Sequence, residues 1–483
     1  MNSKLHYQNN NTTIPGLMRL LAIVLVFTFA PTNTAAAHQP EGNDKPKRVV
    51  LTMEQAISRA LEKNNQVRAA KFGLQKARWD KKHAWTLLLP TLSFNTRYTW
   101  IDDSTFALRD FSRYFSDPNS PFDIPQTVFQ SSYFSSFDVS MTLFNGALLN
   151  GISLANANVD MSEHFSESTR ENMLFLVISS YLNVLKSQEI LKVQQEYQEL
   201  SKLNFEKAER MHNAGRYSKT EALRWKVDYQ QQKSVVVNSE SVLRNDRSVL
   251  HRVLNTKTDE EIDIVPELPK RLLNESRKLA LLSDEEILEI IQLGENELVR
   301  MNAALAAAKS NTEVSRLLHR NEYASYLPNV TLSYTHAWWE NNTLALDNYS
   351  PKTLMINVSI PIFTSFQNLT SVKSSYYEYK QSQEEFFDQL QNMRLLLTET
   401  ANRLINLKTQ RELNKAEVEY NEHNYRVVEQ QRERGLLSNI EFIDAKLNLQ
   451  NAKLNEINSH YDFISAMVEL HYLLGRLGAI VSN

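Results

Sequence analysis

The sequence predicts a mainly α-helical protein with a small β part. Three observations support this fold class: two stretches of about 65–70 residues without proline, four segments of about ten residues in which apolar and polar side chains alternate, and a duplication of the whole order of elements. Helical stretches of that length favour long antiparallel coiled-coil hairpins. The alternating segments favour β-strands with one apolar and one polar face.

The composition excludes several classes of protein. The 483 residues include 53 Lys and Arg against 56 Asp and Glu, which gives a net charge of −3, and they include 10 glycines and no cysteine. This balance lacks the cationic excess of a nucleic-acid binder. The absence of cysteine excludes disulfide scaffolds, thiolate zinc sites, iron–sulfur clusters and lipid attached through an N-terminal cysteine.

The first 37 residues are typical of a secretory signal peptide. Lys4 and Arg19 precede an apolar run of 11 residues at 20–30, and Ala35-Ala36-Ala37 supplies a cleavage site of small residues. A spanning helix needs about 20 apolar residues, so the run is too short to cross a membrane. We therefore expect an exported chain rather than one held by an interfacial anchor, and no transmembrane helix after residue 37.

A helical pattern over residues 53–88 is followed by Pro90, which cannot continue a helix. The alternating pattern then predicts four strands, at residues 91–100, 133–143, 329–338 and 354–362. No other segment indicates a second sheet. We expect Trp100, Trp338 and Trp339 to lie at strand ends, where an interfacial aromatic girdle places such side chains.

Four strands are too few to close a barrel, which needs about eight or more. Their length is that of strands that cross an outer membrane, and lipid tolerates no open sheet edge, so several protomers would have to share one barrel. The alternative is a soluble antiparallel sheet with its polar face in water. The aromatic strand ends favour the shared barrel.

The long helices carry apolar residues at the spacing of coiled coils. The 3-4 alternation extends from Ile440 to His471, and a seven-residue seam extends from Ala222 to Leu250. Such spacing predicts the pairing of antiparallel neighbours across a short tip. Gln450 and His471 interrupt the apolar seam, and we interpret them as polar seam residues that fix the register rather than as ligands.

Two short tips carry the residues that end one helix and begin the next. Gly215 and Gly435 suit the left-handed position after a helix, and Ser218 and Ser438 suit the N-cap of the following helix. The tips lie 220 residues apart in the sequence. We therefore predict one helical hairpin in each half of the chain.

Three acidic residues follow the tips. Glu221 and Glu441 stand three residues after the N-cap serines and complete a capping box in each copy. Asp444 lies one turn beyond Glu441 on the same helix face, where no cap requires an acid. An electrostatic role at the tip and a solvated surface position explain Asp444 equally well.

The duplication sets the expected domain boundaries. Leu89-Pro90 recurs as Leu327-Pro328, and the strand that ends in Phe144 recurs as one that ends in Phe363. The predicted parts are a signal peptide at residues 1–37, a first repeat at 38–253, a polar linker at 254–282, a second repeat at 283–478 and a tail at 479–483.

This ordered duplicate resembles the TolC family of outer-membrane efflux and secretion channels. The resemblance covers residues 51–478 and rests on the helix, the Leu-Pro strand, the strand ending in Phe, the very long helix and the glycine tip, all of which occur twice. It implies a homotrimer with a shared twelve-strand β-barrel in the outer membrane, in contact with its lipid, and a long periplasmic tunnel of twelve helices. It also implies two partners, a periplasmic adaptor (membrane fusion protein) and an inner-membrane transporter.

The resemblance assigns roles to residues at the tips. The expected acidic residues of the periplasmic aperture are Glu221, Glu441 and Asp444, and the expected adaptor contacts are Gly215, Arg216, Gly435 and Leu436. The chain departs from the family at Leu437, where some members have an arginine that holds the gate closed. The candidate substitutes for that arginine are Arg432, Arg434 and Arg216.

These expectations indicate a passive duct of a tripartite efflux or type I secretion system, gated at its tips by the adaptor and pump. The sequence has no His-Glu-x-x-His, no Gly-rich phosphate loop and no Gly-x-Ser-x-Gly, so we expect no catalytic residue, cofactor or metal site. The alternative function is that of a soluble periplasmic coiled-coil scaffold or adaptor-like protein, which leaves the four strands unexplained. The sequence does not specify whether drugs, metals or proteins are transported.

Overall fold

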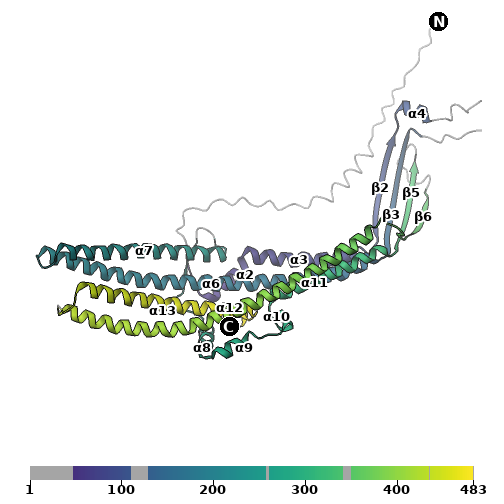
Figure 1. Ribbon diagram of the computed structural model, residues 1–483. Coiled ribbons are helices and arrows are strands. Elements are labelled where there is room, and N and C mark those ends of the chain that lie inside the picture. Colours follow the sequence, from purple (N-terminus) through teal and green to yellow (C-terminus); the bar gives the residue numbers. More distant parts are fainter. Residues whose placement is uncertain (1–46, 110–128, 257–259, 341–349, 435, 482–483) are drawn as a thin grey trace, which may run out of the picture. The chain divides into compact units, whose positions relative to one another are not determined.

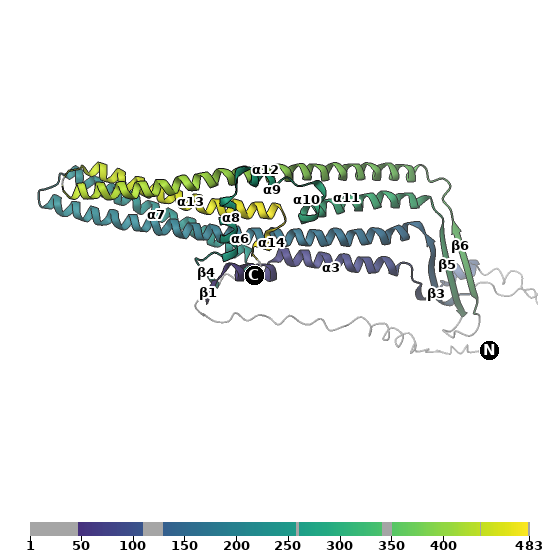
Figure 2. The ribbon, with the colours of Figure 1, turned by 90° about the horizontal axis from the view of Figure 1, so that it is seen from below.

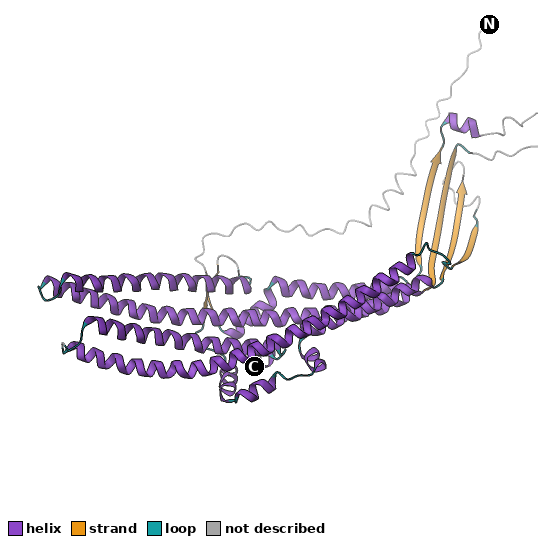
Figure 3. Ribbon diagram, viewed as in Figure 1, coloured by secondary structure: helices purple, strands orange, loops and turns teal. Residues whose placement is uncertain are grey.

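The computed structural model describes residues 47–109, 129–256, 260–340, 350–434 and 436–481. This part of the chain is mainly helical and carries two small sheets (Figures 1 and 3). The fold class predicted from the sequence is therefore confirmed. The predicted signal peptide and Gly435 lie outside the described residues.

The first half of the chain contains two long helices, one strand hairpin and several short elements. Its elements are β1 (Lys47–Leu51), α2 (Met53–Lys63), α3 (Asn65–Thr86), β2 (Thr91–Trp100), α4 (Asp103–Arg109), β3 (Ser131–Asn145), α6 (Gly146–Asn213) and α7 (Lys219–Val253). The helical pattern predicted over residues 53–88 is confirmed, but Asn64 divides it into α2 and α3. The Asn64 side chain accepts a hydrogen bond from the Gln66 N–H at 2.8 Å and so caps α3.

The second half repeats this order after a connecting stretch. Its elements are β4 (Glu260–Ile264), α8 (Lys270–Leu281), α9 (Asp284–Ile290), α10 (Glu295–Met301), α11 (Ala303–Glu322), the 3-10 helix η1 (Tyr323–Tyr326), β5 (Asn329–Glu340), β6 (Lys352–Ser359), α12 (Gln367–Glu433), α13 (Asn439–Leu473) and α14 (Leu477–Val481). The predicted linker at 254–282 therefore contains a strand and a helix.

The two very long helices are α6, with 68 residues, and α12, with 67. At 1.5 Å per residue each is about 100 Å long. The half of α6 nearer its C-terminus pairs with α7 as hairpin 1, and the corresponding half of α12 pairs with α13 as hairpin 2 (Figure 1). The other halves form a layer in the order α3, α6, α11, α12 (Figure 2). The predicted hairpins are confirmed.

The larger sheet has four antiparallel strands in the order β2-β3-β5-β6. All four predicted strands are present, although β6 ends at Ser359 rather than at Ile362. Pro361 lacks an N–H group and cannot continue the ladder. The apolar face carries Leu354, Ile356 and Val358, whose exposed fractions are 68%, 61% and 57%. An apolar face so exposed indicates a surface that another molecule or a membrane covers.

The prediction of no second sheet is wrong, because β1 and β4 form a two-stranded sheet. The single O–H of Tyr181 on α6 is shared between two acceptors, the Val265 carbonyl at 2.7 Å and the Leu51 carbonyl at 3.2 Å. Strands of five residues are too short to give a clear alternating pattern. A buried tyrosine on the neighbouring helix therefore anchors the ends of both strands.

The main hydrophobic core lies where α6 and α13 meet the short helices. It contains Tyr181 and Leu182 of α6 and Phe463, Ile464 and Met467 of α13, all at most 1% exposed. Residues of α2, α8 and α14 complete this core. Among the described residues, no helix combines the length and the apolar character that a membrane crossing would require.

Candidate functional site

The tip of hairpin 1 is closed by the residues that its sequence predicts. Gly215 has a φ of +69°, a left-handed conformation that only glycine adopts without strain. Ser218 and Glu221 form the predicted capping box: the Glu221 N–H donates to Ser218 Oγ at 3.2 Å and the Ser218 N–H donates to Glu221 Oε2 at 3.1 Å. Arg216 is exposed at this tip.

At the tip of hairpin 2, the N-terminus of α13 carries the same kind of capping box. The Ser438 N–H donates to Glu441 Oε2 at 2.9 Å, and the Glu441 N–H donates to Ser438 Oγ at 3.4 Å. The Ser438 hydroxyl also donates to Glu441 Oε2 at 2.8 Å, and the two hydrogen bonds that the carboxylate accepts, first from the Ser438 N–H and then from its hydroxyl, lower the pKa of Glu441. Leu436 is 70% exposed, so the turn presents an apolar side chain to its surroundings.

The three predicted aperture acids have different surroundings. Glu221 is half-buried, and its Oε1 accepts a hydrogen bond from Asn439 Nδ2 of hairpin 2 at 3.2 Å. Glu441 is exposed but held by its cap. Asp444 is exposed and forms no hydrogen bond or ion pair with any residue that the structure describes. Within one chain, Glu221 therefore helps to join the hairpins, and Glu441 and Asp444 leave charge on the surface.

Next to the tips, Arg432 binds hairpin 2 to hairpin 1. Its Nη2 donates to Asn204 Oδ1 of α6 at 3.1 Å, and its guanidinium lies 3.9 Å from the centroid of the Phe442 ring and 5.0 Å from that of Trp225. Burial lowers the pKa of this guanidinium, which nevertheless stays protonated. Arg434 and Arg216 are exposed, so Arg432 differs from the other two candidate gate arginines.

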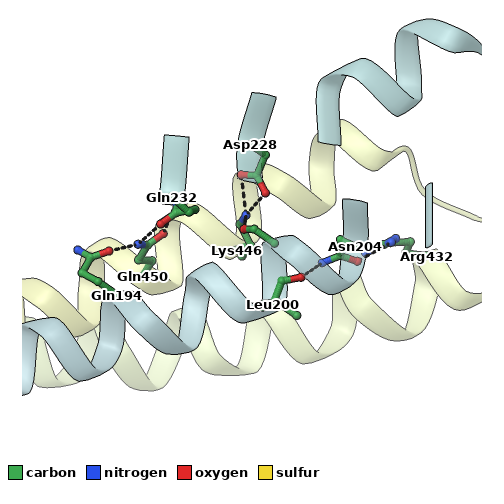
Figure 4. Close-up of polar contacts among 9 residues, drawn as sticks. Gln194, Leu200, Asn204, Asp228, Gln232, Arg432, Lys446 and Gln450 are labelled. Atoms are coloured by element: carbon green, nitrogen blue, oxygen red, sulfur yellow. Dashed lines mark hydrogen bonds and ion pairs between the residues drawn. The ribbon is translucent and has the colours of Figure 1, made fainter. Parts of the chain in front are cut away.

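Further along α13 from the tip, a buried ion pair joins the two hairpins (Figure 4). Lys446 Nζ of α13 lies 2.7 and 2.6 Å from the two carboxylate oxygens of Asp228 on α7 and 2.9 Å from Ser201 Oγ on α6. The Lys446 side chain is 0% exposed and that of Asp228 is 9% exposed. Burial lowers the pKa of Lys446, and the hydrogen bonds and charge of Asp228 oppose that effect.

One turn beyond Lys446 on α13, three glutamines meet in the same interface (Figure 4). Gln450 Nε2 donates to Gln194 Oε1 of α6 at 2.6 Å and to Gln232 Oε1 of α7 at 3.0 Å. The prediction that Gln450 is a polar seam residue is confirmed, and its role in fixing the register stays a prediction. We call the contacts of Arg432, Lys446 and Gln450 with α6 and α7 the hairpin junction.

Sequence reasoning identified Gln450 but not its partners in the hairpin junction. Asp228 and Gln232 are four residues apart, as are Lys446 and Gln450, and each bonded pair is separated by 218 residues. That separation differs by two from the 220 residues between the tips. At the offset of 220, Asp228 matches Asn448 and Gln232 matches Ala452, so the repeat alone does not reveal these pairs.

The other predicted polar seam residue, His471, lies near α8 rather than in the hairpin junction. Its Nε2 is 3.7 Å from Glu275 Oε1, and burial lowers the pKa of the imidazole. Among the described residues, no group of three or more His, Cys, Asp or Glu side chains could hold a metal ion. His471 therefore has one acidic neighbour and no set of further ligands.

Comparisons with known proteins agree with this geometry. The chain is similar to the outer membrane channel CmeC of Campylobacter jejuni, with a TM-score of 0.74, 12% identity, and coverage of 88% of this chain and 86% of CmeC. It is also similar to the outer membrane protein VceC of Vibrio cholerae, with a TM-score of 0.70, 13% identity, and coverage of 88% and 96%. At such identities the likeness concerns the fold.

A third solved structure describes an open state. It is the MtrE outer membrane channel of Neisseria gonorrhoeae, with a TM-score of 0.68, 15% identity, and coverage of 92% of this chain and 96% of MtrE. No curated protein sequence matches the chain. A sequence profile of the outer membrane efflux protein family matches residues 56–256 and 296–476, one stretch in each half. The chain therefore belongs to the outer membrane efflux protein family, whose members are passive channels rather than enzymes.

Proposed function

We propose that this protein is the outer-membrane channel of a tripartite efflux or type I secretion system. It is a passive duct that spans the outer membrane as a homotrimer, extends into the periplasm and opens at its helical tips when an adaptor and an inner-membrane transporter engage it. The observation that carries this proposal is the four-stranded sheet with an exposed apolar face at the end of helices about 100 Å long.

The sheet supports assembly from several chains. Within the described residues, β2 and β6 each pair along one edge only. Lipid tolerates no unpaired strand edge, so the sheet needs strands from further copies of the chain. Three copies of four strands give twelve, and this number is large enough to enclose a lumen. The apolar side chains then face lipid and the polar ones face the lumen.

The tips support an acidic periplasmic aperture. The capping hydrogen bonds lower the pKa of Glu441 and so further favour its ionised form, and Asp444 adds a second exposed acid one turn along the same face. In a trimer, these residues give six carboxylates around the narrow end of the tunnel. A constriction lined by carboxylates favours cations and repels anions.

The surface of the tips supports docking of an adaptor. Arg216 and Leu436 are exposed on turns that no other described segment covers. The hairpin junction binds hairpin 2 to hairpin 1 within one chain, so opening by movement of one hairpin would have to rearrange Arg432 and Lys446. The exposed residues Arg434 and Arg216 are the remaining candidates for closing contacts between protomers.

Single-channel recording in planar bilayers tests the proposal. With both acids neutralised, as Glu441→Gln with Asp444→Asn, the reversal potential in a salt gradient should move toward zero because the cation preference falls. Glu285→Gln removes an exposed acid of α9, away from the tips, and should leave the reversal potential unchanged. An unchanged reversal potential in the double variant would disprove the aperture assignment. Recovery of the native protein in the soluble periplasmic fraction would favour the scaffold function instead.

A further inference from the structure

Among the described residues of the four strands, a single carboxylate lies on the polar face of the sheet, at its centre. Asp138 is the middle residue of β3, which runs from Ser131 to Asn145 and is paired on both sides. It stands opposite Ser93 of β2 and opposite Thr335 of β5. Asp138 is partly exposed, so its charge is not enclosed in a core.

Neutral donors from three strands hold this carboxylate in place. Its Oδ2 accepts hydrogen bonds from Asn95 Nδ2 at 2.8 Å and from Ser136 Oγ at 2.6 Å, and its Oδ1 accepts one from Thr335 Oγ1 at 2.7 Å. Neutral donors orient a carboxylate without cancelling its charge. Among the described residues, no Lys, Arg or His lies within ion-pair distance of Asp138.

The nearest base of the four strands on the same face stands four positions from Asp138 along the sheet. Arg97 stands opposite Phe134, which is four residues from Asp138 along β3, and its guanidinium lies 5.6 Å from the Phe134 ring centroid. Four residues of a strand span about 14 Å. Arg97 therefore stands at a different level of the sheet, and it forms no ion pair with Asp138.

We propose that Asp138 is a second determinant of cation selectivity, located in the barrel and independent of the aperture acids. This inference rests on the proposed function, because the polar face lines an aqueous lumen only in the closed barrel. Three copies of the chain then place three fixed negative charges at one level of the lumen wall. Such a ring raises the local concentration of cations and lowers that of anions.

The arrangement of the donors distinguishes a charge effect from a structural one. Replacing Asp138 by asparagine keeps the size of the side chain and one carbonyl oxygen for Asn95, Ser136 or Thr335, but removes the charge. Thr335→Val removes one of the three hydrogen bonds and keeps the charge. Selectivity should follow the charge, whereas the order of the strands should follow the hydrogen bonds.

The experiment measures reversal potentials of the purified full-length trimer in planar bilayers under a KCl gradient. Asp138→Asn should lower the cation-to-anion permeability ratio about twofold, and Thr335→Val should leave it at the wild-type value. Asn357→Asp adds a carboxylate to the same polar face and should raise the ratio. A rise in cation selectivity in this variant could not result from loss of folding.

The outcomes separate this inference from the proposed function. A wild-type protein without conductance would contradict both. A cation-selective wild type whose ratio is unchanged by Asp138→Asn and by Asn357→Asp would overturn only the role of Asp138. Equal losses in Asp138→Asn and Thr335→Val would also overturn it, because the effect would then follow the hydrogen bonds. A loss that adds to that of the Glu441→Gln and Asp444→Asn double variant would support two independent sites.

Discussion

Replacing Asp228 by asparagine should destabilise the protein by about 3 kcal/mol at neutral pH. Lys446 is fully buried, and Asp228 is its charged partner at 2.6 Å. Breaking a buried ion pair from one side costs about 3–5 kcal/mol, because the remaining charge has no counterion. The amide oxygen of the new side chain would keep one hydrogen bond to the ammonium, so the lower end of the range applies.

The destabilisation caused by Asp228→Asn should become smaller as the pH rises. Without Asp228, burial and the charge of Arg432 both lower the pKa of Lys446, which in the folded protein falls further below the unfolded value of about 10.4. Between these two pKa values the unfolded chain binds the extra proton, so stability rises with pH by up to about 1.4 kcal/mol per unit. The difference between variant and wild type should therefore be smaller at pH 9.5 than at pH 7.

Thermal unfolding followed by the helical circular dichroism signal in detergent measures this effect. An unfolding entropy of about 2.1 cal/mol/K per residue over 483 residues converts 3 kcal/mol into a fall in Tm of about 3 °C. Asp228→Asn combined with Lys446→Met removes both charges and should recover most of the loss and its dependence on pH.

A partly exposed ion pair in hairpin 2 provides the control. Glu422 Oε1 lies 3.4 Å from Lys453 Nζ, and the two side chains are 40% and 33% exposed. Glu422→Gln should cost less than about 1 kcal/mol, because water screens the pair. The reasoning fails if Asp228→Asn costs no more than this control, or if its cost is the same at pH 7 and pH 9.5.

Two further predictions concern α13 and its end. Burial, with Arg411 and Lys415 nearby, lowers the pKa of His460 to about 4, so the unfolded chain takes up a proton below pH 6.5 that the folded one does not. Acidification from pH 7 to 5 should therefore cost about 2 kcal/mol through His460, and His460→Gln should remove that part of the acid-induced fall in Tm. Gly475 has a φ of +65°, and an added Cβ would lie 1.9 Å from the Met301 carbonyl oxygen. Gly475→Ala should cost about 2 kcal/mol or more, whereas Gly478→Ala, which meets nothing within 4 Å, should be close to neutral in the same unfolding assay.

The sequence predicted the elements whose signals are local. The capping boxes at Ser218 and Ser438 were confirmed because a cap depends on residues three positions apart. The four long strands were confirmed because alternation over eight or more residues matches the period of a strand and not that of a helix. Gly215 was confirmed as left-handed, since the position after a helix often needs a positive φ and glycine adopts it without strain from a Cβ.

Contacts between distant segments were not predictable in the same way. From the sequence pattern alone, Lys446 would be expected on the solvated face of a helix. Its burial is possible only because Asp228 lies opposite it on the neighbouring hairpin. The break at Asn64 depends equally on tertiary contacts, because the Asn64 Nδ2 also donates to the Val253 carbonyl at the end of α7. The aperture roles of Glu441 and Asp444 depend on other copies of the chain, which no pattern within one chain reports.

The central pairing of the larger sheet has a consequence for how the chain folds. β2 and β3 are close in sequence, but β3 meets β5 across 184 residues, the separation of Asn145 from Asn329. Such a contact forms late, because the entropy cost of closing a long loop comes before the strand pairing that compensates for it. Until the second half docks, β3 exposes one open edge beside an apolar face, which is the kind of surface that captures strands of other chains. The newly made protein is therefore most prone to aggregate in that interval, and a chaperone that covers the β3 edge would protect it.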